Sequence, residues 1–163
     1  MKKESIKAYS YRVSQASKTE LIVIMYDMAI EYLNDCFIYE EDKKRICEDD
    51  DFTVNIKMAK RVIDSLISAL DMQYEISSQL FKSYSVMSSY LIKASSSKDG
   101  ALIESVIKML EMLRKSFYEI SSQDKSGPVM KNTQQVYAGL TYSNAGSSNE
   151  FSNDPVNNRG FIV

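Results

Sequence analysis

Apolar residues recur every three or four positions in four stretches between residues 17 and 126. This spacing is that of one face of an α-helix, whereas a half-buried strand would alternate with a period of two. A single glycine, Gly100, and no proline interrupt residues 1–126, so the strongest helix breakers are nearly absent from this part of the chain. The pattern predicts four amphipathic helices with short links, which favours an all-α fold, an antiparallel four-helix bundle.

The first predicted helix begins after a capping box and extends to about residue 40. The Ser17 hydroxyl is placed to accept a hydrogen bond from the backbone N–H of Glu20, while the Glu20 carboxylate reaches back to the N–H of Ser17. The charge-rich residues 40–51 are interpreted as a solvated connection whose aspartates can cap the second helix. The core face predicted for the first helix consists of Leu21, Met25, Met28, Ala29, Tyr32 and Cys36.

The other three helices each carry an apolar line with steps of three or four residues. Ser97 or Asp99 is expected to cap the last helix. No breaker occurs around residues 71–75, so the sequence leaves open whether the chain turns sharply or bends between the second and third helices. The predicted core lines are Phe52, Ile56, Ala59, Ile63, Leu66 and Leu70, then Ile76, Leu80, Tyr84, Met87, Leu91 and Ala94, then Leu102, Val106, Met109, Leu113, Phe117 and Ile120.

The first and fourth helices carry more apolar residues than one core face needs. Such a surplus marks either a fully buried helix or an apolar groove that accepts a partner, and periodicity leaves both interpretations open. Methionines on the helix faces favour a groove slightly, because thioether side chains adapt to a bound helix. The second apolar lines are Ile22, Tyr26, Ile30 and Phe37, and Ile103, Ile107 and Leu110; the methionines are Met25, Met28, Met58, Met87, Met109 and Met112.

Composition divides the chain into three segments. Residues 1–16 precede the first cap and form an N-terminal arm, whose Tyr9 and Tyr11 must pack against something or fray. Residues 17–126 form the predicted bundle. From Gly127 onward serine, asparagine, glycine and proline dominate, which predicts a flexible tail over residues 127–163.

Charge and residue usage argue against several classes of function. The 20 basic and 22 acidic residues lack the basic excess that nucleic-acid binding requires. Histidine is absent, which removes Ser-His and Cys-His nucleophile pairs. Cys36 and Cys47 are too few for a zinc site and are interpreted as inert thiols. We therefore expect no catalytic residue, cofactor or metal, and no enzymatic activity; an enzyme built on carboxylates alone lacks an apolar pocket around an acid pair.

No stretch has the length of a membrane span or the pattern of a secretory signal. The longest apolar run covers only residues 21–26, and a span needs about 20 residues. We therefore expect a cytoplasmic protein that does not insert into membranes.

An ordered set of residues resembles the FliS family of bacterial flagellar export chaperones over about residues 6–121. Three positions depart mildly from the family pattern: Lys18 replaces a proline, Met28 a glycine and Phe117 a tryptophan. The residues that carry the resemblance are Ala8-Tyr9, Ala16-Ser17, Glu20-Leu21, Met25-Tyr26-Asp27, Ala29-Ile30 and Leu33, then Ala59, Val62-Ile63, Leu66, Leu70-Asp71, Leu80, Tyr84, Met87, Leu91, Leu110, Leu113-Arg114 and Phe117.

The resemblance implies a chaperone that binds the C-terminal segment of flagellin in apolar grooves, prevents premature polymerisation and keeps its client competent for export. It also implies an arm that covers part of the groove, and the flagellar export gate as a further partner. The alternative is a helical adaptor that binds another amphipathic segment or self-associates; the client face and the oligomeric state stay open. The candidate client-binding residues are Tyr9, Tyr11, Ile22, Tyr26, Ile30, Ile103, Ile107 and Leu110.

Overall fold

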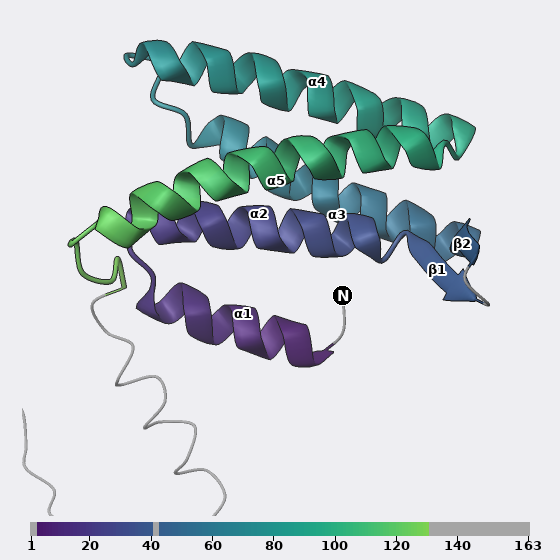
Figure 1. The fold of residues 1–163 in the computed structure, drawn as a ribbon, viewed down its shortest axis with the longest axis horizontal. Coiled ribbons are helices and arrows are strands. Elements are labelled where there is room, and N and C mark those ends of the chain that lie inside the picture. Colours follow the sequence, from purple (N-terminus) through teal and green to yellow (C-terminus); the bar gives the residue numbers. More distant parts are fainter. Residues whose placement is uncertain (1–2, 41–42, 131–163) are drawn as a thin grey trace, which may run out of the picture. The chain divides into compact units, whose positions relative to one another are not determined.

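The computed structural model describes residues 3–40 and 43–130, which are mostly helical (Figure 1). This part of the chain contains five helices and one two-stranded antiparallel hairpin. The sequence predicted the four long helices but missed the first helix and the hairpin. The elements are α1 (Lys3–Gln15), α2 (Lys18–Asn34), β1 (Phe37–Glu40), β2 (Lys43–Ile46), α3 (Asp49–Ser68), α4 (Glu75–Ser97) and α5 (Gly100–Gln123).

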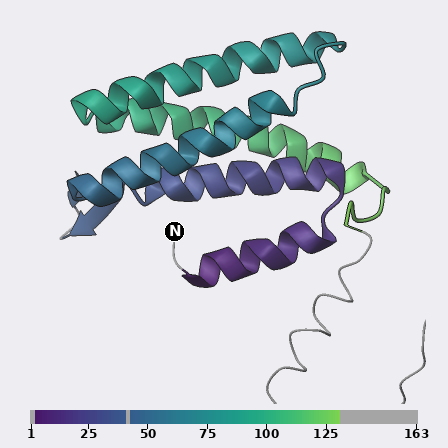
Figure 2. The same cartoon turned by 180° about the vertical axis from the view of Figure 1, so that it is seen from behind.

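Helices α2 to α5 pack in a closed ring, in which α2 and α4 each contact both α3 and α5. Successive helices of the ring run in opposite directions (Figures 1 and 2). Their apolar faces meet in one cluster, here called the main core. Its buried members are Tyr26, Ala29, Tyr32, Leu33, Cys36, Phe37, Cys47, Phe52, Ile56, Ala59, Ile63, Leu66, Leu80, Tyr84, Met87, Leu91, Ala94, Ile103, Val106, Ile107 and Leu110.

A polar contact is built into the centre of the main core. The hydroxyls of Tyr26 and Tyr84 hydrogen-bond to each other, so neither buried phenol is left without a partner. The ring of Tyr26 also packs against that of Phe117, with 5.6 Å between the ring centroids. These contacts join α2, α4 and α5, and burial together with the hydrogen bond raises the pKa of the Tyr26 phenol above its usual range.

The helix starts follow the predicted caps in two of three cases. The Ser17 hydroxyl accepts from the N–H of Glu20 at 3.2 Å, and Asp99 accepts from the N–H of Ala101 at 2.9 Å, so Asp99 rather than Ser97 caps α5. The aspartates before the second predicted helix do not cap it. Glu48 occupies the cap position without a side-chain hydrogen bond, and residues 49–51 form the first turn of α3, where negative charge favours the helix dipole.

The expectation that the first helix extends to about residue 40 was wrong. Helix α2 ends at Asn34, and the chain then forms the β1–β2 hairpin with Phe37 opposite Ile46. Aromatic and β-branched side chains at residues 37–39 fit a strand better than a helix. The hairpin is held at the start of α5, because a Cβ added at Gly100 would lie 3.1 Å from the Phe37 ring and Lys44 forms an ion pair with Glu104 at 2.6 Å.

The predicted core lines needed correction at each of the four helices. On α2 the predicted Leu21, Met25 and Met28 are only half-buried, whereas Tyr26 and Leu33 lie in the main core. Leu70, predicted for the second line, is half-buried and lies past the end of α3.

On α5 the buried residues are Ile103, Val106, Ile107 and Leu110. Val106 is the one buried member of the predicted line, since Leu102, Met109, Leu113 and Phe117 are half-buried and Ile120 is exposed. Helix α5 packs against both α2 and α4, so its apolar stripe is wide. The residues predicted from regular spacing lie along one edge of this stripe rather than at its centre. On α4, Ile76 is exposed because it lies in the first turn, just after the sharp turn over residues 69–74.

The chain divides into two units, Met1–Lys131 and Asn132–Val163. Most of the predicted flexible tail, residues 131–163, lies outside the described residues. Its described beginning contacts the link between α1 and α2, because the N–H of Val129 donates to the carbonyl oxygen of Ala16 at 3.0 Å. This bond ties the residues just after the expected boundary at residue 127 to the helical unit.

Candidate functional site

Helix α1 is the predicted N-terminal arm, and it packs along one face of α2. Ile24, Asp27 and Glu31 share that face of α2, since they are spaced by three and four residues. The Asp27 carboxylate accepts from the Arg12 guanidinium of α1 at 2.8 Å and also pairs with Arg114 of α5. The Tyr9 hydroxyl hydrogen-bonds to Glu31; burial, followed by this bond, raises the pKa of Tyr9 above its usual range.

This packing accounts for part of the apolar surplus on α2. Val23 and Ile24 are buried although they do not belong to the main core, and Ile24 lies on the face that pairs with α1. The residues on the opposite face, including Tyr26 and Leu33, are inside the main core. Helix α2 is therefore buried on two opposite faces, with α1 beside one of them, while Met25 and Met28 stay half-buried.

The candidate client-binding residues are divided between the core and the surface. Ile22 and Ile30 are half-buried and pack against the main core, Tyr9 is half-buried and Tyr11 is 60% exposed. The other four were expected to lie beside the core, and this expectation was wrong. Helices α2 and α5 pack against each other, and this packing buries their extra apolar residues. The four residues inside the main core are Tyr26, Ile103, Ile107 and Leu110.

A groove of 230 Å³ lies between α2 and α3, with a wall of methionines. Met25 and Met28 come from α2, Met58 and Val62 come from α3, and Arg61 is also part of the lining. Unbranched thioether side chains change shape at low cost, so a groove lined by them can accommodate apolar side chains of varied shape. The sequence had marked these methionines, but the groove depends on how α2 and α3 pack.

A second groove, of 340 Å³, lies between α3 and α4. Its lining combines the apolar side chains of Ile56, Leu91 and Ile92 with Lys57 and Lys60. Ile56 and Leu91 belong to the main core, so Ile92, which is 56% exposed, supplies the accessible apolar surface beside the two ammonium groups. Nothing in the sequence pattern singled out this groove, because its residues come from the edges of two separate core lines.

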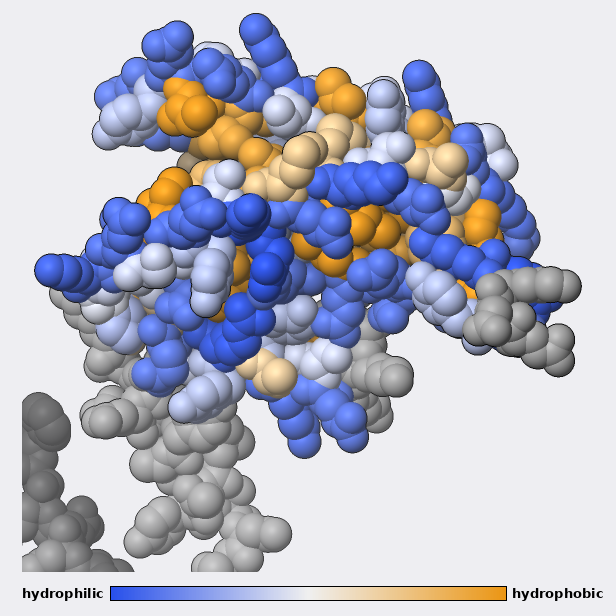
Figure 3. All heavy atoms as spheres, viewed as in Figure 1, coloured by the Kyte–Doolittle hydropathy of each residue, from blue (hydrophilic) through white to orange (hydrophobic). Residues whose placement is uncertain are grey.

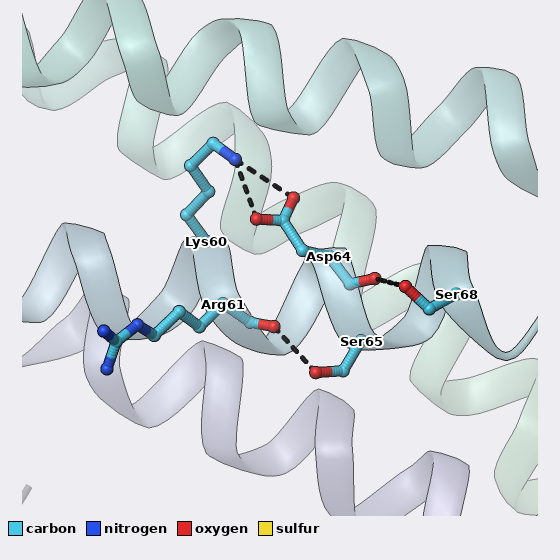
Figure 4. A network of polar contacts seen from close by, with 5 residues as sticks. All are labelled: Lys60, Arg61, Asp64, Ser65 and Ser68. Atoms are coloured by element: carbon cyan, nitrogen blue, oxygen red, sulfur yellow. Dashed lines mark hydrogen bonds and ion pairs between the residues drawn. The ribbon is translucent and has the colours of Figure 1, made fainter.

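The ridge of α3 between the two grooves carries polar side chains that bond within the helix (Figure 4). Lys60 donates to both carboxylate oxygens of Asp64, at 2.8 and 3.0 Å. The Ser65 hydroxyl donates to the carbonyl oxygen of Arg61, and the Ser68 hydroxyl donates to that of Asp64, each at 2.9 Å. These bonds all lie within α3, so the polar ridge separates the two grooves.

The face shown in Figure 3 carries further apolar surface, which gathers over α4 and α5. On these helices Tyr90, Leu102, Met109 and Leu113 are half-buried against the main core. The apolar surface of the helical unit is thus spread over several helices rather than confined to one pocket.

No cluster of acidic or cysteine side chains within residues 3–40 and 43–130 is arranged to hold a metal ion. In the same part of the chain, no helix is both long enough and apolar enough to span a membrane.

The chain was compared with models of known protein families. The family model described as "Flagellar protein FliS" matches residues 2–124 of the 163 residues. The chain belongs to the FliS family. The FliS match includes all the described helices and the hairpin, and it confirms the resemblance seen over about residues 6–121. No match was found among curated proteins.

Proposed function

We propose that this FliS-family chain is a cytoplasmic chaperone that binds the C-terminal helical segment of flagellin, prevents its premature polymerisation and delivers it in an export-competent state to the flagellar export gate. The family match over residues 2–124 carries the proposal. The two grooves beside α3 support it, because each offers apolar side chains between neighbouring helices. We assign the ring of α2 to α5 as the four-helix bundle of this chaperone.

The methionine-lined groove between α2 and α3 is the first contact surface that we assign to the client. A client helix that places apolar side chains there gains roughly 1.5 to 3 kcal/mol for each one that it buries fully. A segment that folds on binding loses about 2 to 5 kcal/mol or more in ordering. About two to four buried anchor residues are therefore needed to offset the ordering loss alone, and further contacts must offset the lost translational and rotational freedom. A groove of 230 Å³ supplies part of that contact surface.

Helix α1 is the second element of the proposal. Its Tyr9 and Tyr11, together with Ile22 and Ile30 of α2, remain the candidate client contacts that are not enclosed in the main core. In the proposal the client competes with α1 for the face of α2 that carries Ile24. The four candidates in the main core would then support the binding surface from below rather than contact the client.

Co-expression with the flagellin of the same organism, followed by size exclusion, tests the function. We expect a one-to-one complex with full-length flagellin and no co-elution once its last helical segment is deleted. Equal binding of both forms, or binding of neither, would contradict the chaperone proposal. In the second case a helical adaptor for another amphipathic segment becomes the leading alternative.

A pair of matched methionine variants tests the site. Met28 lines the α2–α3 groove, whereas Met112 of α5 is 64% exposed and lines neither groove. Met28→Asp should weaken flagellin binding by about tenfold or more, because a buried unpaired carboxylate loses its hydration. Met112→Asp should bind as the parent chain does. If the two variants bind equally well, the α2–α3 groove is not the client site, whatever the outcome of the co-elution test.

A further inference from the structure

The two cysteines of the chain lie opposite each other at the base of the hairpin. Phe37 pairs with Ile46 in the β1–β2 ladder, and Cys36 and Cys47 are the next residues in the same register. The N–H of Cys47 donates to the carbonyl oxygen of Cys36 at 2.9 Å, so the ladder continues to this pair. Both thiols are free and buried, and both belong to the main core.

The ladder places the backbones of these two residues directly opposite each other, within the range of Cα separations at which disulfides form. Directly opposed residues of an antiparallel ladder point their side chains to the same side of the sheet, with Cα atoms about 5.5 Å apart at a hydrogen-bonded pair. Disulfides form across Cα separations of roughly 4.4 to 6.8 Å. The Cβ atoms of directly opposed residues lie about 4.5 to 5.5 Å apart, whereas a disulfide needs roughly 3.5 to 4.5 Å. The bond therefore requires a small approach of the two strands at this end of the ladder. It also requires new side-chain rotamers and loss of the weak hydrogen bond from the Cys36 thiol to the carbonyl oxygen of Tyr32 at 3.5 Å.

We propose that Cys36 and Cys47 form a redox-modification site, at which a low-molecular-weight disulfide such as oxidised glutathione converts the two thiols into an intramolecular disulfide. Cys47 is the point of entry, because it is 8% exposed and Cys36 is completely buried. This inference concerns the hairpin alone and does not depend on the proposed client.

The reaction is two successive thiol–disulfide exchanges. The Cys47 thiolate attacks one sulfur of oxidised glutathione, the glutathione S–S bond breaks, and one glutathione thiolate leaves. The Cys36 thiolate then attacks the Cys47 sulfur and displaces the second glutathione thiolate. The two protons lost by the cysteines are taken up by the two glutathione thiolates, so two cysteine thiols are oxidised and one glutathione disulfide is reduced.

The bond would connect the end of α2 to the start of α3. The N–H of Cys36 donates to the carbonyl oxygen of Leu33 in the last turn of α2, and Cys47 directly precedes Glu48, the cap residue of α3. Burial raises the pKa of the Cys36 thiol to about 12 and raises that of Cys47 as well. Both groups are therefore protonated at neutral pH, and the exchange is slow compared with that of an exposed thiol.

The test is incubation of the folded full chain with oxidised glutathione, followed by intact mass measurement and non-reducing peptide mapping. We expect the loss of two hydrogen masses, a peptide containing residue 36 linked to one containing residue 47, and reversal by dithiothreitol. Cys36→Ala and Cys47→Ala should show no internal link. The oxidised chain should have a higher thermal midpoint than the reduced chain, because the closed loop restricts the unfolded state.

Three outcomes would overturn the proposal. One is a chain that ends as mixed disulfides with glutathione, and another is a disulfide-linked dimer. The third is a chain that stays unmodified when folded but forms the link when unfolded in urea, since this would show that the native hairpin prevents the bond.

Discussion

Asp27 is shared by two arginines that come from different helices. Its side chain is only 13% exposed, and it pairs with Arg12 of α1 and Arg114 of α5. The pairing, chiefly through the hydrogen bond to Asp27, raises the pKa of Arg114 above its usual value. One carboxylate thus joins three helices at a position where water screens its charge only partly.

Replacement of this carboxylate should therefore destabilise the fold. Asp27→Asn should lower the free energy of unfolding by about 1 to 2 kcal/mol, less than for a fully buried pair because both arginines are partly exposed. Asp64→Asn is the matched control, since it removes the exposed pair with Lys60 and should change that free energy by about 0.5 kcal/mol or less. Urea unfolding measures both, and equal effects would show that the three-helix contact contributes nothing extra.

Asp124 predicts a pH dependence of the segment after α5. Hydrogen bonds from Ser126 and then from Thr19 hold the pKa of this carboxyl well below its usual range. A carboxyl with a lowered folded pKa stabilises the fold fully above its unfolded pKa of about 3.9. This contribution begins to fall below that pH and is completely lost below the folded value, so about pH 3 lies where part of it is gone.

Amide exchange at Val129, measured by NMR at about pH 6 and about pH 3 and corrected for the intrinsic pH effect, should therefore show less protection in acid. In Asp124→Asn the difference in protection between the two pH values should be smaller than in the parent chain. A parent chain that is equally protected at both would rule out this role of the carboxylate.

The sequence predicted elements well where the signal is local and poorly where it depends on neighbours. The starts of α2 and α5 follow from Ser17 and Asp99, because a cap is read within three residues. Helix α1 has few apolar residues, and the side-chain bonds that join it to α2 are polar ones with Asp27 and Glu31, so periodicity alone did not reveal it. The buried face of α5 and both grooves depend on which helices lie side by side. The spacing of apolar residues along one helix carries no information about its neighbours.

The segment that follows α5 is tied to the chain by a bond that composition did not reveal. Val129 bonds to Ala16 between α1 and α2. A chain that ends at Met130 should therefore be more stable than one that ends at Ser126 by about 1 kcal/mol, the net value of one backbone hydrogen bond. Urea unfolding of the two shortened chains tests this difference. Identical midpoints would restore a boundary at residue 127.

In the molecule as a whole, α2 is the central element. It packs against α1, α3 and α5, whereas α1 packs mainly against α2. Local opening costs more where more apolar contacts must separate. Hydrogen exchange measured by mass spectrometry should therefore be slowest in α2 and much faster in α1. Equal protection of the two helices would mean that α1 opens only when the whole fold opens.

The way in which α1 is attached has a consequence for reversibility. Ser17 belongs to the start of α2 and makes its capping bond with Glu20, and Arg114 reaches Asp27 independently of Arg12. If α1 swings away, α2 keeps its cap and Asp27 keeps a counter-ion, so the departure leaves neither a fraying helix end nor an isolated charge. Such a helix can leave and return many times without unravelling the helix beneath it.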